Sequence, residues 1–107
     1  MMFALNETAV LYPLMGQRGA RPAYAETGTA FHCRSEAAWV QRLSGNAVEH
    51  AADTRIFAQY VDAHPGDRVT LNGRCYRIAE VRPMRALRGI HHLEMLAKDE
   101  GPCEEDV

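Results

Sequence analysis

The fold is indicated most clearly by a stretch in the second half of the chain, RVTLNGRCYRI at residues 68–78. Its centre, Asn72-Gly73, separates two segments in which apolar and polar residues alternate. A two-residue type I′ turn needs positive φ at both central positions, and Asn-Gly adopts such angles at little cost. The stretch therefore predicts a tight β-hairpin in which Val69 lies opposite Tyr76.

The two faces of this hairpin differ in character. Alternation places Val69, Leu71, Tyr76 and Ile78 on one face, and Arg68, Thr70, Cys75 and Arg77 on the other. The same register puts Arg68 directly opposite Arg77, and like charges across a strand pair repel each other. We expect water and salt, or an acidic partner, to neutralise this arginine pair.

Further strands are expected on both sides of the hairpin. Four more segments have the composition or alternation of strands, namely residues 4–12, 29–36, 54–61 and 90–97. Turn residues separate them, as in His64-Pro65-Gly66-Asp67. The sequence therefore predicts an all-β, mainly antiparallel fold, a small β-barrel or sandwich of about five to six strands with long loops.

Residues 36–43 have two interpretations. Ser35 is a suitable N-cap, helix-forming residues follow it, and Gly45 is a suitable end, so a two-turn helix is an alternative to a strand that runs into a loop. Residues 16–22 and 44–52, GQRGARP and SGNAVEHAA, are expected to be mobile loops.

The composition predicts a single domain. The chain has 107 residues, of which 47% are hydrophobic and 24% charged, as in ordinary globular proteins. We expect residues 1–98 to form one barrel-like domain and residues 99–107, which contain five acidic residues and no basic one, to form a flexible acidic tail. A net charge of −2 argues against a surface that coats nucleic acid. No apolar run approaches the ~20 residues of a membrane span, and no basic region typical of a secretory signal begins the chain.

The chemistry-bearing residues predict neither catalysis nor metal binding. Cys33, Cys75 and Cys103 are an odd, scattered set, which predicts free thiols rather than a disulfide framework. His91 and His92 are adjacent and point to opposite faces of a strand, and the spacing of His32, Cys75 and His92 does not demand a zinc site. No nucleophile, phosphate-loop or metalloprotease motif is present. We therefore expect no catalytic residues, no metal and no cofactor.

Arginine dominates the basic residues. Eleven of the twelve are arginine, and the segment 74–88 holds five of them against the single acid Glu80. Guanidinium groups bind carboxylates and phosphates in a bidentate manner. An Arg-rich loop on the rim of the barrel is therefore expected to contact nucleic-acid phosphates or an acidic protein surface, with a solvated loop as the alternative. The residues concerned are Arg74, Arg77, Arg82, Arg85 and Arg88.

The segment from residue 28 to residue 98 resembles the small head–tail joining proteins of tailed bacteriophages, also called head-completion, head-closure or stopper proteins. The family has a hairpin of the pattern D-x-V-x-x-x-G-x-x-Y-x-I-x-x-V, followed by a charged loop and a closing strand. The matching residues are Asp67, Val69, Gly73, Tyr76, Ile78 and Val81, then Leu87-Arg88-Gly89 and His91-His92-Leu93-Glu94. The segment TAFHCRSEA at residues 29–37 resembles an earlier strand of the family.

The resemblance implies a structural component of the virion neck, without catalysis. Such a protein is made in the host cytoplasm and assembles as a homo-oligomeric ring at the head–tail junction. There it contacts portal or adaptor proteins on one side and tail proteins on the other, retains packaged DNA and does not touch a membrane. The expected interface residues are Arg18, Arg21, Asn46, Glu49, His50, Arg82, Arg85 and Arg88. The separation of charge along the chain suggests that the acidic tail of one subunit pairs with arginines of the next.

Two other functions remain open at this point. A tail-terminator or related ring protein of the tail has the same general features and differs in its partners. A small Arg-rich β-barrel that binds nucleic acid is an alternative of another class, and it predicts binding that weakens steeply with salt.

Overall fold

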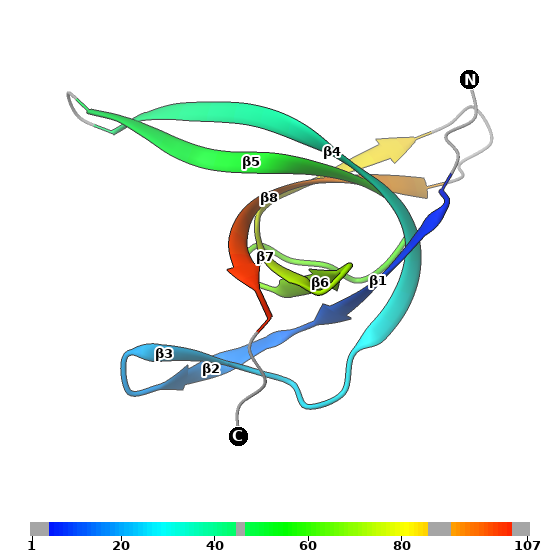
Figure 1. Cartoon of the computed structure of the whole chain (residues 1–107), viewed down its shortest axis with the longest axis horizontal. Helices are drawn as coiled ribbons and strands as arrows, with labels where there is room; N and C mark the ends of the chain where they lie inside the picture. Colours follow the sequence, from blue (N-terminus) through cyan, green and yellow to red (C-terminus); the bar gives the residue numbers. More distant parts are fainter. Residues whose placement is uncertain (1–4, 45–46, 86–90, 104–107) are drawn as a thin grey trace.

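The structure, a computed structural model, describes residues 5–44, 47–85 and 91–103. Within that description, side chains are not placed for residues 39–44, 47–51, 85 and 91. The described residues form strands and turns and contain no helix (Figure 1). The strands are β1 (Glu7–Tyr12), β2 (Leu14–Arg18), β3 (Arg21–Tyr24), β4 (Thr29–Ser44), β5 (Ala47–Gln59), β6 (Arg68–Leu71), β7 (Arg74–Arg85) and β8 (His91–Pro102). In the described part of the chain, no helix is long and apolar enough to cross a membrane.

Six of these strands close into a barrel. The order around the wall is β1-β4-β5-β8-β7-β6, every neighbouring pair is antiparallel, and β6 returns to β1. The remaining two, β2 and β3, form a separate antiparallel hairpin beside the barrel (Figure 1). The predicted all-β antiparallel fold is confirmed, and of its two forms the barrel is the correct one.

The Asn72-Gly73 hairpin has the predicted geometry. Asn72 has φ 53° and Gly73 has φ 77°, as a type I′ turn requires. Val69 pairs with Tyr76, and Arg68 pairs with Arg77. The face carrying Val69, Leu71, Tyr76 and Ile78 is buried inside the barrel.

Apolar side chains from all six barrel strands fill the interior, as expected for a barrel of this size. Phe31, Ile56, Ile78 and Met95 are the largest of those that solvent does not reach. The alternation in the sequence predicted the inward-facing residues of two strands correctly. Phe31 and Cys33 point inward from β4, and Leu93, Met95 and Ala97 do so from β8. The core therefore follows directly from the period of two in the sequence.

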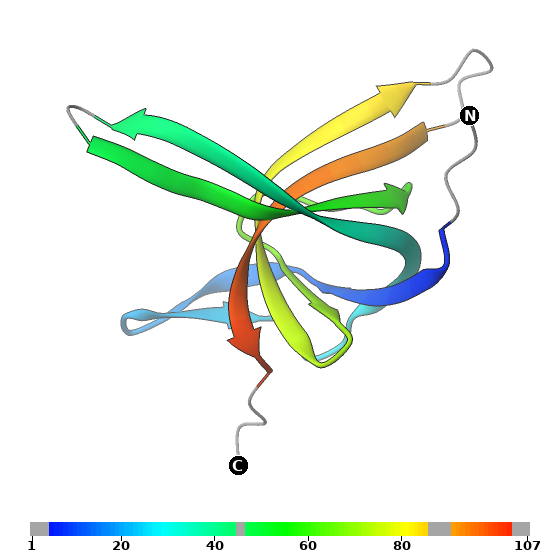
Figure 2. The same ribbon diagram turned by 45° about the horizontal axis from the view of Figure 1, so that its top comes forward.

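Of the two interpretations of residues 36–43, the strand is correct and the helix is wrong, and the loop expected at residues 44–52 is wrong for the described residues 44 and 47–52. Residues 36–43 belong to β4, and residues 47–52 belong to β5. The two strands pair with each other from Ala37↔Thr54 to Ser44↔Ala47, and their register is irregular on both sides of Val40. Together they extend well past the barrel wall as a long two-stranded arm (Figures 1 and 2). We define the arm as residues 36–44 and 47–53.

The expected loop at residues 16–22 is also wrong in part. These residues lie mostly in β2 and β3, and only Gly19-Ala20 form the turn between them. Gly19 has φ 60°, a conformation that glycine adopts without strain. Backbone bonding continues past the hairpin, since the amide of Ala25 donates to the carbonyl of Pro13 at 2.9 Å.

The structure revises the expected end of the barrel at residue 98. β8 continues to Pro102, where it pairs with Arg74. A disulfide then joins Cys103 to Cys75, with Cα atoms 5.1 Å apart, so the prediction of free thiols holds for Cys33 alone. Sequence spacing missed this bridge because β8 pairing, and not proximity along the chain, brings the two cysteines together. Residues 104–107 of the expected tail lie outside the described part.

Candidate functional site

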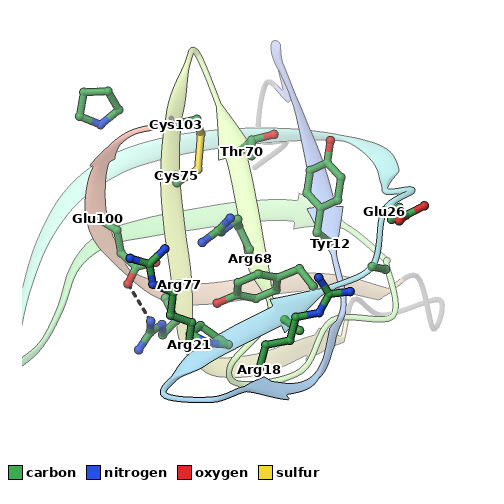
Figure 3. A pocket seen from close by; sticks show the side chains of 15 residues that line it. Tyr12, Arg18, Arg21, Glu26, Arg68, Thr70, Cys75, Arg77, Glu100 and Cys103 are labelled. Atoms are coloured by element: carbon green, nitrogen blue, oxygen red, sulfur yellow. Dashed lines mark ion pairs between the residues drawn. A yellow bond between two sulfur atoms is a disulfide. The ribbon is translucent and has the colours of Figure 1, made fainter. Parts of the chain in front are cut away.

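A groove of about 1050 Å³ lies between the β2–β3 hairpin and the outer face of β6 and β7 (Figure 3). Arg18 and Arg21 line it from the hairpin, and Arg68 and Arg77 line it from the barrel. Glu26 and Glu100 are the acidic residues of its lining. We call this site the arginine groove; four arginines and two glutamates leave it with an excess of positive charge.

Strand register explains why these four arginines gather. Arg18 pairs with Arg21 across the β2–β3 hairpin, and Arg68 pairs with Arg77 across β6–β7. Side chains directly opposite each other in a ladder share a face, so each hairpin presents two guanidinium groups together. Two like-charged cross-strand pairs therefore line one groove.

The pair on the barrel has local partners. The guanidinium carbon of Arg68 lies 4.2 Å from the centre of the Tyr24 ring, a cation–π contact. A guanidinium nitrogen of Arg77 lies 3.0 Å from a carboxylate oxygen of Glu100. The repulsion expected between Arg68 and Arg77 is thus offset by an aromatic ring and an acid, both supplied by other strands.

The pair on the hairpin has no such partners. Arg18 and Arg21 are exposed, and no hydrogen bond or ion pair joins either of them to another described residue. Their positive charges face the groove without local neutralisation. This is the part of the site where an incoming anion meets the least competition.

Two donors in this region are buried without an acceptor among the described residues. They are the hydroxyl of Tyr24 and the Nε–H of Arg68. Leaving a buried donor unsatisfied costs about 1–3 kcal/mol. Both groups belong to residues of the groove lining, and a small side-chain movement that brought either one to an acceptor would relieve this cost.

The other arginines expected to contact DNA or an acidic surface are already paired elsewhere. Nε of Arg74 lies 2.9 Å from an oxygen of Asp99. The hydrogen bond from Arg74, and a second one from the amide of Gly101, lower the pKa of Asp99. Arg82 lies 3.0 Å from Glu80 and 3.3 Å from Glu94. The structure thus does not bring these two arginines into the groove that holds Arg77.

The expected Arg-rich rim loop is shorter than the sequence suggested. β7 runs through Arg82 to Arg85, which pairs with His91 of β8. Arg85 is therefore a strand residue whose side chain is not described, and Arg88 lies outside the described residues. The prediction for these two side chains stays a prediction.

The expected interface residues in the middle of the chain fall on the arm. Glu49 and His50 lie in β5, where they pair with Arg42 and Gln41 of β4. Asn46 lies outside the described residues. Residues 44–52 are therefore placed on a projecting hairpin, which was expected to be a loop.

The arm has two open edges. β1 pairs with β4 only from Thr29 to Cys33, and β8 pairs with β5 only from Thr54 to Gln59. Beyond these points β4 and β5 pair with each other alone. Within the described chain, the outer backbone groups of residues 36–44 and 47–53 thus have no strand partner.

The sequence analysis named Arg18, Arg21 and Arg77 as candidate residues, but it did not predict the groove that they share. It left Arg68, Tyr24 and Glu100 out of the candidate residues. The opposition of Arg68 and Arg77 was the available signal, because it required a neutralising partner. The folding of β2–β3 over that face brings the Tyr24 ring to Arg68, and β8 brings Glu100 to Arg77. Neither local pattern nor residue spacing predicts these contacts.

The described residues contain no group of three or more His, Cys, Asp or Glu side chains placed to hold a metal ion. The composite of His32, Cys75 and His92 is ruled out because Cys75 is bound to Cys103. Comparison of the chain with protein-family models and with curated proteins finds no match. The arm and the arginine groove are therefore the features of the described chain that bear on its function.

Proposed function

We propose that this protein is a structural component of a phage virion neck, a head–tail joining or stopper protein that assembles as a ring. The observation that carries the proposal is the arm, a two-stranded hairpin with open edges that projects from a closed barrel (Figure 2). The sequence resemblance of the 67–81 hairpin supports the same family.

The arm suits repeated contact between copies. The six barrel strands pair in a closed order, whereas the two strands of the arm pair only with each other and leave backbone donors and acceptors without a strand partner along both outer sides. An added strand from a neighbour satisfies such groups, and this mode of binding is common. When the same heterologous contact repeats by a rotation that closes, a ring results.

The proposed ring lies at the head–tail junction of the particle after synthesis in the host cytoplasm. Portal or adaptor proteins adjoin it on the head side, tail proteins adjoin it on the other, and packaged DNA passes through it. A tail terminator is the closest alternative, and the identity of the direct partner distinguishes the two.

The test is the position of the chain in purified particles. We expect antibody label at the single vertex where head meets tail, seen by electron microscopy. Intact, tailed particles that lack the chain would reject the proposal.

A second test uses a variant in which residues 39–52 are replaced by Asn-Gly, so that Ala38 and Asp53 flank the new turn and the register of Ala37 with Thr54 is kept. The barrel strands and their pairing remain in this variant, so the free protein is expected to fold, as circular dichroism would report. We expect the variant to be absent from particles. The matched control is Arg34→Ala with Lys98→Ala, which changes two exposed basic residues outside the arm and outside the expected interface and should be incorporated normally. Incorporation of the arm variant would remove the arm from the interface.

Nucleic-acid binding is a second candidate, favoured by the arginine groove alone. It predicts that the isolated chain binds duplex or single-stranded DNA at low salt and that the affinity falls steeply as salt rises. Arg18 and Arg21 would then be required, because they are the groove arginines without local partners.

A further inference from the structure

We propose that the arginine groove binds the acidic segment Glu104–Asp106 of a second copy of this chain. The inference deepens the proposed function, since it names a contact between neighbouring subunits of the ring. It is carried by the two opposed arginine pairs, the unsatisfied donors beside them and the direction in which β8 leaves the barrel.

The groove is built for an acceptor with negative charge. Arg18 and Arg21 lack partners among the described residues, and Tyr24 and Arg68, which carry the unsatisfied donors, belong to the same lining. A carboxylate is an acceptor only, and it binds guanidinium in a bidentate manner. Carboxylates therefore match both the charge and the hydrogen-bonding groups of the groove.

The composition of the lining favours an acidic peptide over nucleic acid. Glu26 and Glu100 belong to the groove, and they would repel a continuous row of phosphates. Part of the Tyr24 ring face is already covered by Arg68, which reduces its use as a stacking surface for a base. A peptide with spaced carboxylates and backbone N–H groups tolerates both features.

The chain supplies such a peptide directly after Cys103. Glu104, Glu105 and Asp106 are consecutive acids. Three residues span at most about 10 Å when extended, so the segment is short enough to fit within one groove.

The register of β8 shows that the described chain runs away from Arg77 before this segment begins. Along β7, Arg77 pairs with Lys98 and Arg74 pairs with Pro102, and the amide of Cys103 donates to the carbonyl of Gly73 at 2.9 Å. The chain thus moves from Arg77 toward the 72–73 turn as it approaches Cys103. In Figure 3 the Cys75–Cys103 disulfide, which belongs to the lining, lies at the end of the site away from Arg18 and Arg21. This direction favours a groove on a neighbouring copy.

The first experiment measures peptide binding to the full chain. The protein is the full chain with the three substitutions Glu104→Gln, Glu105→Gln and Asp106→Asn, which make its own segment 104–106 neutral. A peptide of residues 100–107, with serine in place of cysteine, is titrated against this variant. We expect binding at low salt that weakens as salt rises. Adding Arg18→Ala and Arg21→Ala should weaken it by about five- to tenfold, the loss of two exposed ion pairs.

The matched control is the pair Arg34→Ala and Arg82→Ala in the same background, which removes two exposed arginines outside the groove. Its peptide affinity should stay unchanged. Absence of binding, or equal losses in the two double variants, would overturn the proposal. Tighter, groove-dependent binding of a 12-nucleotide single strand would replace it with the nucleic-acid alternative.

The second experiment asks whether the contact is between chains. A variant with Arg18→Ala and Arg21→Ala has an intact acidic segment, and the neutral-segment variant has an intact groove. We expect the mixture to form a heterodimer, detected by native mass spectrometry, while each variant alone dimerises less. No heterodimer would mean that the segment does not bind a second copy.

These outcomes separate the inference from the proposed function. Peptide binding and heterodimer formation by a chain that is absent from the neck would reject the neck assignment alone. A chain located at the neck that fails both binding tests would reject the groove contact alone.

Discussion

Cys33 and Cys75 lie on opposite faces of the barrel wall, and their chemistry differs accordingly. Cys33 points into the core and is 0% exposed. Burial, with a smaller contribution from the nearby charge of Glu7, raises the pKa of its thiol to about 11. Cys75 lies on the outer face, where it bonds to Cys103. One thiol is thus protected by packing, and the other two are protected by the covalent bond.

This arrangement predicts the number of reactive thiols in each state. In the native protein we expect no reaction with a thiol reagent at neutral pH, because the reactive thiolate is scarce and inaccessible. In denaturant one thiol per chain should react, and in denaturant after reduction three should react. Spectrophotometric titration checks these values. More than one reactive thiol in denaturant alone would contradict the disulfide.

Asp99 predicts a specific pH dependence. The hydrogen bond from Arg74, followed by that from the amide of Gly101, lowers its pKa in the folded state. The unfolded chain then binds the proton more tightly than the folded one, so the stabilisation is complete above the unfolded value near 3.9. It is lost as the pH falls through the lower, folded value.

Urea unfolding of the wild type and Asp99→Asn at several pH values measures this effect. The free-energy difference between the two proteins should be constant from pH 7 to about pH 5 and should shrink below about pH 4. Lys98→Gln, a neighbouring exposed change of charge, is the control and should not show that dependence. A wild-type advantage that is the same at pH 7 and pH 3 would exclude Asp99 as its source.

Among the elements, the β2–β3 hairpin is attached to the barrel in part by a buried carboxylate, that of Asp67. Asp67 is 4% exposed. One oxygen accepts from the amide of Leu14, where β2 begins, at 2.8 Å, and the other accepts from the amide of His64 at 2.9 Å. Asp67 therefore joins the turn before β6 to the start of the hairpin that forms one wall of the arginine groove.

Replacement of Asp67 should weaken this attachment. We expect Asp67→Ala to lower the free energy of unfolding by about 2–4 kcal/mol, because two backbone donors lose a charged acceptor. Asp67→Asn keeps one acceptor oxygen and should cost about half as much. Denaturant unfolding measures both. Equal stability of Asp67→Ala and the wild type would show that the hairpin is held by other contacts.

The elements also show which parts of the fold are predictable from sequence. The 68–78 hairpin was correct because its turn depends on two adjacent residues and its faces on simple alternation. The arm was not predicted. Residues 36–43 contain good helix formers, which left helix and strand as alternatives, and they become a strand only by pairing with a segment further along the chain. Pairing overrides local propensity there. The arginine groove was missed for a similar reason, since its two walls come from separate hairpins.

In the molecule as a whole, one covalent bond fastens the end of the last strand. Cys75 and Cys103 are 28 residues apart, and closing a loop of that length stabilises a protein by about 3–4 kcal/mol through the entropy of the unfolded chain. Without the bridge, the end of β8 depends on its strand pairing and on exposed ion pairs.

Reduction of the protein is therefore expected to lower its melting temperature by roughly 10–25 °C. Calorimetry with and without reductant measures the change. Cys103→Ser should melt near the reduced wild type and should not respond to reductant, which makes it the control for side effects of the reagent. Identical melting of oxidised and reduced wild type would show that the bond adds no stability.

The position of β8 in the wall determines when the barrel forms during synthesis. β8 follows the other five barrel strands along the chain, yet it lies between β5 and β7. A nascent chain that has reached only β7 exposes the facing edges of both strands, together with the apolar surface of an unfinished core. Closure then requires contacts between residues far apart in sequence, which form slowly. The barrel thus cannot close before residues 91–102 have been made, and until then its open edges and unfinished core are surfaces prone to aggregation.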